Sequence, residues 1–440
     1  MNRRKFLSTL LRAGVATTAF MLDNPFRPMI RLAHAAVGKT LVVVFQRGGC
    51  DGLNTVVPYG DPDYRSLRPT IYIPEPDSGE PNPALPLNDL FGLHPGLAAL
   101  MPIWEAGDMA ILPTVQYPSA SRSHFDGQHF IESAASPADR ADKENLDGWL
   151  NRHLATLDQT GLLRAVSFGN SVAQSLRGPM SVSSFGDLSQ FDFGLEDDQG
   201  EALLDNLVPI YGQPLNPDTA YRRLLYNSGG TVINNLAVAK HIVTDGYEPA
   251  PGAVYPNTTY GRQLKQIAQL IKKQEIDLGD GPQPVGLEIA TVNIGGWDTH
   301  SNQGNGTPNG RQTQRFRQFA DGIAALYTDL GSRMSDVIIL TMTEFGRTAK
   351  ENGSFGTDHG NGATWFVIGE NVVGDIYGEW PGLAPDLLYR GRYLAHTVDY
   401  RNVLAEILTG FMGNLDLSVV YTGSESPDSP TDYQPVGFLA

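Results

Sequence analysis

The chain has 440 residues, a formal net charge of −16 and one cysteine, Cys50. At about 150 residues per domain, this length allows one large domain or two smaller ones, with a sizeable core in either case. The negative charge argues against nucleic acid as a partner, because it repels phosphate backbones. A single cysteine excludes an internal disulfide, so stability must come from the core and from any bound metal.

The first residues have the pattern of an export signal. Arg3 and Arg4 form a twin-arginine pair ahead of a mildly apolar stretch at 10–22, and 33–35 (Ala-His-Ala) has the small residues that a signal peptidase needs. We predict a twin-arginine signal peptide over 1–35, with the twin-arginine translocase as the partner that exports the folded chain to the periplasm or cell exterior. No run reaches about 18 apolar residues, so we expect no transmembrane helix.

Six short apolar runs along the remaining chain predict strands. The first is a continuous β-branched run, which is typical of a strand buried on both faces of a parallel sheet. The runs are 39–45, 109–115, 163–168, 286–294, 336–343 and 364–368. Apolar residues at helical spacing lie between and after them, at 267–271, 316–330 and 403–411. This alternation predicts an α/β sandwich with a mostly parallel sheet.

Two stretches interrupt the alternation of strands and helices. Residues 58–90 are rich in Pro, Asp and Gly, and 180–256 have mixed composition with many turn residues. We expect both to be surface insertions, or a cap over the site, within a single domain that spans 36–440. The Ser/Pro/Asp-rich segment 423–434 is expected to be a surface tail.

The residues that follow the predicted strands are the candidates for chemistry, because open α/β sheets bind ligands at the carboxyl ends of their strands. Asp51 follows the first strand in a glycine-rich turn, where it could hold a cation or simply cap the next segment. Asp298 and His300 follow the fourth strand. Two residues apart in extended chain, they point the same way, which suits zinc or manganese ligation or a local hydrogen bond.

Two further motifs follow the fifth strand. Glu344 is a carboxylate at the strand end, and Arg347 could pair with an oxyanion or with Glu344. Asp358 and His359 are adjacent and flanked by glycines, which leaves room for a ligand.

The segment after the second strand contains Ser121, Arg122 and Ser123. Hydroxyl groups at a helix N-terminus can bind an anion or supply a nucleophile, and they can also serve only as caps. Arg122 or Arg347 would bind the anionic group of a substrate. If all these groups meet at one edge of the sheet, they provide the metal ligands, anion-binding groups and nucleophile of a metal-assisted ester hydrolase.

In combination, these motifs resemble the bacterial domain-of-unknown-function 1501 family. The resemblance covers nearly the whole chain after the leader and rests on TLVVVFQRGGCDGLNTVVPYGDPDYRSLRP, SRSHFDGQ, GGWDTHSNQ, TEFGRT and DHGNG. The family is uncharacterised and is grouped with the alkaline phosphatase and sulfatase superfamily. The resemblance therefore implies an α/β/α sandwich, alkaline phosphatase-like, and commonly a two-metal site.

The resemblance also implies roles for individual residues. Asp51 matches the first metal-binding aspartate of the superfamily, and Asp298 and His300 resemble its Asp-and-His ligand pair, although their spacing is shorter here. The implied cofactors are divalent metal ions, namely zinc, manganese or calcium.

Two alignments are open for the last motif. Asp358 and His359 resemble the Asp-His-Gly motif of the superfamily; alternatively, Glu344 takes that place and His359 matches the last histidine. The segment before Arg122 lacks the cysteine of sulfatases, which argues against a formylglycine sulfatase and leaves Ser121, Ser123 or no protein nucleophile.

Two functions compete on this basis. The first is an exported metal-dependent hydrolase that acts on a small anionic ester of the phosphate or sulfate type. The alternative is a non-catalytic exported binding or assembly protein that retains the hydrolase-like fold.

Overall fold

The computed structural model describes residues 38–118, 120–135, 147–157, 161–188, 206, 237–243, 246–277, 281–421 and 433–440. The predicted signal peptide at 1–35 lies outside these residues, as do most of 180–256 and most of the predicted tail at 423–434. No helix among the described residues is long and apolar enough to cross a membrane.

An eight-stranded sheet forms the centre of the protein, in the order β13-β5-β12-β11-β1-β10-β6-β7. Its strands are β1 (Thr40–Arg47), β5 (Met109–Gln116), β6 (Ala165–Phe168), β7 (Ser183–Phe185), β10 (Ile289–Gly295), β11 (Val337–Met342), β12 (Ala363–Ile368) and β13 (Val398–Asp399). β1 pairs in parallel with β10 and with β11. Only β12 runs antiparallel to its neighbours. All six predicted runs form strands of this sheet, and the prediction of a mostly parallel sheet is confirmed.

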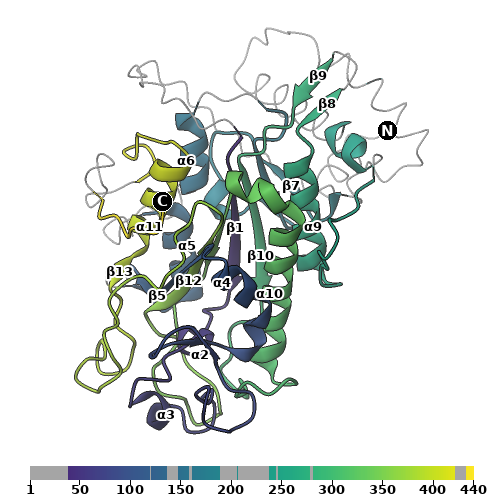
Figure 1. Cartoon of the computed structure of the whole chain (residues 1–440). Helices are drawn as coiled ribbons and strands as arrows, with labels where there is room; N and C mark the ends of the chain where they lie inside the picture. Colours follow the sequence, from purple (N-terminus) through teal and green to yellow (C-terminus); the bar gives the residue numbers. More distant parts are fainter. Residues whose placement is uncertain are drawn as a thin grey trace, which may run out of the picture.

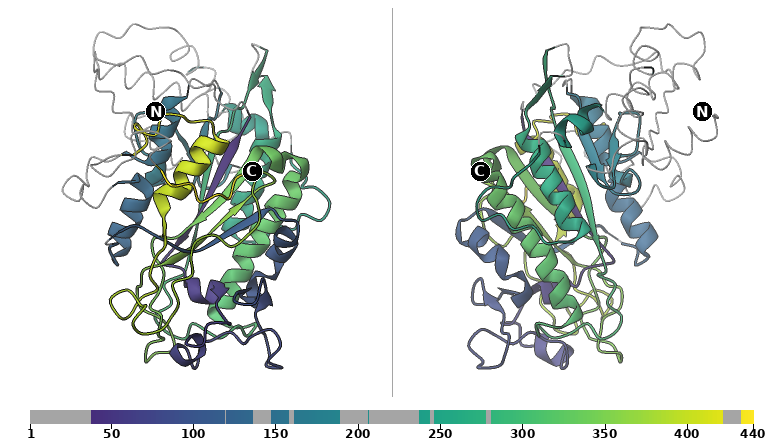
Figure 2. Two further views of the ribbon diagram at one scale, coloured as in Figure 1. Left: turned by 60° about the vertical axis from the view of Figure 1, so that its left-hand side comes forward. Right: turned by 90° about the vertical axis from the view of Figure 1, so that its right-hand side faces the viewer.

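Helices cover both faces of the sheet (Figures 1 and 2). One face carries α9 (Thr259–Lys272), α10 (Arg311–Leu330), the 3-10 helix η1 (Pro95–Leu100) and α4 (Met101–Glu105). The other carries α5 (His124–Ser133), α6 (Trp149–Thr156) and α11 (Tyr400–Glu406), which continues into a π-helical turn at Ile407–Phe411. The fold is therefore the expected α/β/α sandwich.

Alternate side chains of β1 build the two halves of the core. Val42 and Val44 face the α9 and α10 side, while Leu41, Val43 and Phe45 face α5, α6 and α11. All five are at most 3% exposed. Burying an aliphatic or aromatic side chain of this size contributes about 1.5–3 kcal/mol, so this strand fixes the sheet between its two helical layers.

The segment between β1 and β5 forms a small structure at the carboxyl end of the sheet (Figure 1). It comprises α2 (Gly52–Thr55), α3 (Tyr64–Leu67) and a three-stranded sheet of β2 (Val56–Val57), β4 (Gly92–Leu93) and β3 (Leu85–Pro86). Its apolar residues pack against Ala349 and the 383–394 segment. The region at 58–90 thus lies directly beside the loops that follow β11.

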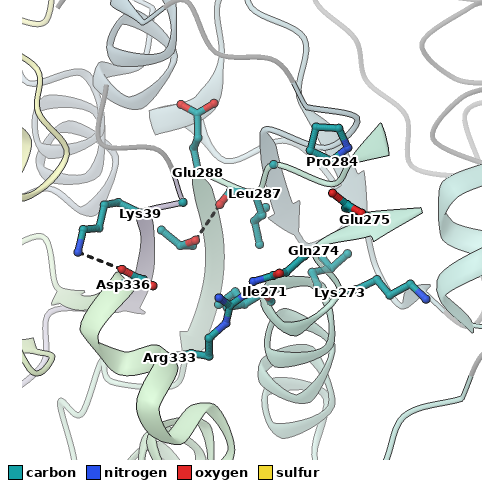
Figure 3. Close-up of a pocket in the computed structure, with 14 residues that line it drawn as sticks. Lys39, Ile271, Lys273, Gln274, Glu275, Pro284, Leu287, Glu288, Arg333 and Asp336 are labelled. Atoms are coloured by element: carbon teal, nitrogen blue, oxygen red, sulfur yellow. Dashed lines mark hydrogen bonds and ion pairs between the residues drawn. The ribbon is translucent and has the colours of Figure 1, made fainter. Parts of the chain in front are cut away.

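A cavity of about 460 Å³ lies at the opposite, amino end of the strands, close to β8 (Glu275–Asp277) and β9 (Pro282–Pro284) (Figure 3). Several of its polar groups are already paired. Lys39 Nζ lies 3.1 Å from Asp336 Oδ1, and the hydroxyl of Thr40 donates to the Leu287 carbonyl at 2.7 Å. Since the candidate residues of the sequence all lie at the other edge, this cavity is not their site.

Candidate metal centre

The carboxyl ends of β1, β10 and β11 bring the candidate residues together. Gly48 and Gly49 directly follow β1 with φ values of 123° and 65°, and a Cβ atom at Gly48 would lie only 2.7 Å from the backbone nitrogen of Asp298. Glycine is required for this approach, since an L side chain is both strained and too large there. The loop after β10 therefore packs directly on the end of β1.

Three imidazoles surround the carboxylate of Asp298. Nε2 of His300 lies 3.0 Å from Asp298 Oδ1, and Nε2 of His359 lies 3.3 Å from the same oxygen. Nε2 of His124, at the start of α5, lies 3.5 Å from Asp298 Oδ2. The ligand atoms of His124, Asp298 and His359 all lie within 4.8 Å of one another, the geometry of a possible metal site.

The other ring nitrogen of each histidine faces an oxygen that can only accept. Nδ1–H of His124 donates to Glu344 Oε1 at 2.8 Å, and that of His300 donates to Asp358 Oδ1 at 2.9 Å. Nδ1–H of His359 donates to the carbonyl of Arg122 at 2.7 Å. A neutral imidazole that donates through Nδ1 carries its lone pair on Nε2.

The three Nε2 atoms therefore lie around one carboxylate, and the possible metal site itself comprises His124, Asp298 and His359. Nε2 of His300 and Nε2 of His359 are 3.1 Å apart, and Nε2 of His124 is buried without a hydrogen-bond partner in the described part of the chain. Donors held in this way, with their Nδ1–H groups tied to oxygen, are typical of metal-binding histidines. The residues present thus fit a divalent cation.

Glu344 is buried at the base of the cluster. It accepts hydrogen bonds from the backbone N–H of Gly48 and from Gln128, both at 2.9 Å, in addition to His124. Burial acts to raise the pKa of Glu344, but the hydrogen bonds from His124, Gln128 and the backbone outweigh it and lower the pKa. The resulting carboxylate raises the pKa of His124 through their hydrogen bond, so a proton competes with a metal ion for that ring.

Arg347 takes a different role from the expected one. Its side chain is 0% exposed and donates to the carbonyls of Gly49 at 2.6 Å, Trp297 at 3.1 Å and Thr357 at 3.2 Å. It also donates to Asp298 Oδ1 at 2.6 Å. The guanidinium is therefore occupied within the protein and orients Asp298, rather than facing a substrate oxyanion or pairing with Glu344.

Asp51 is bound by other side chains and is not among the residues of the possible metal site. Its two oxygens accept from Arg68, Nη1 to Oδ2 at 2.6 Å and Nη2 to Oδ1 at 2.9 Å. Gln303 also donates to Asp51 Oδ2 at 2.6 Å, and the amide oxygen of Gln303 accepts from Thr299 at 2.7 Å and Thr357 at 2.9 Å. Asp51 was expected to hold a cation, and the cationic group that it binds is the guanidinium of Arg68.

The serines lie just before α5. The hydroxyl of Ser121 donates to Asp126 Oδ2 at 3.1 Å and accepts from the backbone N–H of Ser123 at 3.2 Å. Ser123 occupies the N-cap position but makes no capping hydrogen bond. The guanidinium of Arg122 lies over the ring of Tyr393, 4.8 Å from its centroid.

Sequence reasoning missed two residues of this region. His124 was visible in the motif SRSHF after the second strand, at the same kind of position that pointed to Asp51. Arg68 carries no local signal, because it lies in a segment without helical or strand periodicity.

The fold and the cluster define an α/β protein with a histidine and carboxylate centre at the carboxyl edge of its sheet. The family model described as "Protein of unknown function (DUF1501)" matches residues 283–416. This stretch contains all candidate ligands except Asp51 and His124, and it carries three of the motifs on which the resemblance to this family rests, GGWDTHSNQ, TEFGRT and DHGNG.

Two solved structures are similar to the chain at low identity. One is a protein in the alkaline phosphatase superfamily from Vibrio parahaemolyticus, with 10% identity, 99% of this chain and 78% of that chain covered, and a TM-score of 0.36. The other is the phosphonate monoester hydrolase of Agrobacterium radiobacter, with 9% identity, 85% and 74% coverage and a TM-score of 0.32. No curated protein sequence matches the chain. Similarities this weak say nothing about activity or ligands.

Proposed function

We propose that this protein is an exported metal-dependent hydrolase that acts on an anionic ester of the phosphate or sulfate type. The observation that supports the proposal is the convergence of three imidazole Nε2 atoms on the Asp298 carboxylate, each ring held through its Nδ1–H. Nitrogen and oxygen donors together suit zinc or manganese, whereas calcium prefers oxygen ligands alone. The donor set therefore favours zinc or manganese.

In this proposal His124, His300, His359 and Asp298 hold the metal ion. Glu344 and Asp358 orient the rings of His124 and His300, and Arg347 orients the carboxylate of Asp298. A divalent metal ion in such a site polarises the ester oxygen and lowers the pKa of an attacking hydroxyl or water.

Ser121 is the first candidate for a protein nucleophile. Its hydroxyl already donates to Asp126 Oδ2, so the carboxylate can accept the proton when the oxygen attacks. Ser123 is the second candidate, because its hydroxyl makes no capping bond and it directly precedes His124.

One observation favours the non-catalytic alternative. Asp51 and Arg347, both expected to take part in chemistry, are engaged with other groups of the chain. A protein that uses the same fold and a single metal ion to bind a partner would have these features.

Metal analysis combined with hydrolysis assays separates the two functions. The protein is stripped with a chelator, reloaded with zinc, manganese or calcium, and assayed on 4-nitrophenyl phosphate and 4-nitrophenyl sulfate. His124→Ala and His359→Ala should each lose the metal, whereas His241→Ala, outside the cluster, should retain it. Absence of metal and of any rescue would refute the hydrolase. Stoichiometric metal without turnover of either ester would support the binding protein.

A further inference from the structure

A short hairpin with the sequence Tyr-Arg-Gly-Arg-Tyr lies beside the metal centre. The backbone N–H of Tyr389 donates to the Tyr393 carbonyl at 2.9 Å, and that of Tyr393 donates to the Tyr389 carbonyl at 3.1 Å. Arg390 and Gly391 form the turn with φ values of 55° and 65°. Tyr393 also forms a bridge to Thr348, the residue after Arg347, which attaches the hairpin to the loops of the site.

Two arginines from distant parts of the sequence stack on one ring of this hairpin. The guanidinium carbons of Arg122 and Arg392 lie 4.8 Å and 5.6 Å from the centroid of Tyr393. Tyr393 is only 7% exposed, so its ring is a fixed platform. Within the described part of the chain, neither guanidinium donates a hydrogen bond or forms an ion pair. Their N–H groups are free to bind an anion.

Both arginines belong to the surroundings of the cluster. The carbonyl of Arg122 accepts the Nδ1–H of His359. The pKa of Asp358 is lowered chiefly by its hydrogen bond from His300, and the positive charge of Arg392 lowers it further. Both arginines therefore lie next to residues of the cluster, Arg122 through its backbone carbonyl at His359 and Arg392 through its charge near Asp358.

The charges around the site indicate how many negative charges a bound anion should carry. Arg122 and Arg392 together carry two positive charges that no ion pair of the described residues neutralises. A cation bound in the neighbouring site would add to this positive charge. An anion with two negative charges would neutralise both guanidiniums, whereas a monoanion would leave one of them unpaired. Phosphate monoesters are dianions above a pKa of about 6, whereas sulfate monoesters and phosphate diesters carry one negative charge.

We propose that Arg122 and Arg392, held on the ring of Tyr393, bind the phosphoryl oxygens of the substrate, and that the substrate is a phosphate monoester. This inference rests on the proposed hydrolase function and narrows its substrate class. Arg392 and Tyr393 become substrate-recognition residues that the sequence motifs did not indicate. Guanidinium groups suit this role because their N–H groups match the spacing of phosphate oxygens.

Binding of inorganic phosphate and of phenyl phosphate to the metal-loaded protein tests the assignment without relying on turnover. We expect Arg392→Gln and Arg122→Gln each to weaken binding by about tenfold or more, the effect of losing a charged hydrogen bond. Arg390→Gln is the matched control, since it lies in the same hairpin but over the ring of Tyr389. It should change binding less than about twofold.

A second measurement compares phenyl phosphate, phenyl sulfate and diphenyl phosphate on the same preparations. The wild-type protein should prefer phenyl phosphate over both monoanions, and Arg392→Gln should reduce that preference. The proposal is overturned if the Arg392 and Arg390 variants bind phenyl phosphate equally well. It is also overturned if the wild-type protein binds phenyl sulfate as well as phenyl phosphate. Metal content and ester hydrolysis are measured first. A protein that binds no metal, or that hydrolyses no ester, refutes the hydrolase function. A metal-loaded, active protein with either of the results above refutes only the assignment of the phosphate monoester.

Discussion

Arg68 and Asp51 form a bidentate ion pair in which the two side chains are 0% and 1% exposed. Arg68 also donates to Asn54 and to the carbonyls of Thr348 and Ala349, so its donors are distributed over the loops after β1 and β11. A buried guanidinium in this position supplies the positive charge that the carboxylate would otherwise take from a metal ion. Removal of either partner leaves an unpaired buried charge, which costs about 3–5 kcal/mol.

The pair predicts one metal ion per chain. After loading with zinc or manganese, elemental analysis should give a stoichiometry of one. Asp51→Asn should lower the free energy of unfolding by about 3 kcal/mol, because Arg68 loses its counter-charge, yet the folded variant should still bind the metal. Two ions per chain, or a well-folded Asp51→Asn protein without metal, would contradict this prediction.

Glu344 is predicted to set metal affinity without contacting the metal. Glu344→Gln removes the charged acceptor of the His124 Nδ1–H, and loss of such a supporting group typically weakens binding by about 10- to 100-fold. Competition with a chromogenic chelator measures the change. The exposed residue Glu370 provides the control variant, Glu370→Gln, which should leave affinity unchanged; equal affinities for both variants would rule out the orienting role.

The nucleophile is tested by two serine substitutions. We expect Ser121→Ala to lower kcat by at least about 100-fold, the scale of an assisted proton transfer, with the metal content unchanged. Asp126→Asn should act in the same direction, because the carboxylate can then no longer take the hydroxyl proton. If Ser121→Ala and Ser123→Ala both retain full turnover, attack by a serine is refuted and water is the nucleophile.

Acid should destabilise the protein through His94. Burial lowers the pKa of His94 to about 3, and its Nδ1 accepts a hydrogen bond from the Gly96 N–H at 2.9 Å. In the unfolded chain the pKa is about 6.5, so the unfolded state binds an extra proton between pH 6.5 and 3. Stability due to this group is present above pH 6.5 and decreases by about 1.4 kcal/mol per pH unit below it.

Urea unfolding at pH 7.5 and 4.5 measures this dependence. The difference between the two pH values should be smaller for His94→Asn, which keeps a side-chain acceptor for the Gly96 N–H but does not titrate. His241→Gln should behave as the wild type. An unchanged pH dependence in the His94 variant would show that other groups cause the acid sensitivity.

Export by the twin-arginine route is a separate prediction from the leader. Replacing Arg3 and Arg4 together by lysine should keep the protein in the cytoplasm, because the translocase recognises the arginine pair. Cell fractionation followed by immunodetection measures the distribution. Normal export of the double variant would contradict the assignment of the route.

The strands of this fold could be predicted because each is a short apolar run bounded by turn residues. The direction of β12 could not, since a strand buried on both faces has the same composition in either direction. The rule that strand ends carry function placed Asp298, His300 and His359 in one group, and the structure brings their side chains together. The pairing of Asp51 with Arg68 was beyond sequence reasoning, because it depends on how a segment without periodicity folds back over the sheet.

Gln303 links two loops of the site through its side-chain amide. Its amide oxygen accepts from Thr299, which lies between Asp298 and His300, and from Thr357, two residues before His359, while its amide nitrogen donates to Asp51. The two threonines thus belong to two separate loops that carry proposed ligands. Neither loop can shift alone without leaving a buried hydroxyl unpaired, which costs about 1–3 kcal/mol. The two ligand-bearing loops are therefore expected to open only in concert, so that release of the metal ion is a single cooperative event rather than the sequential loss of individual ligands.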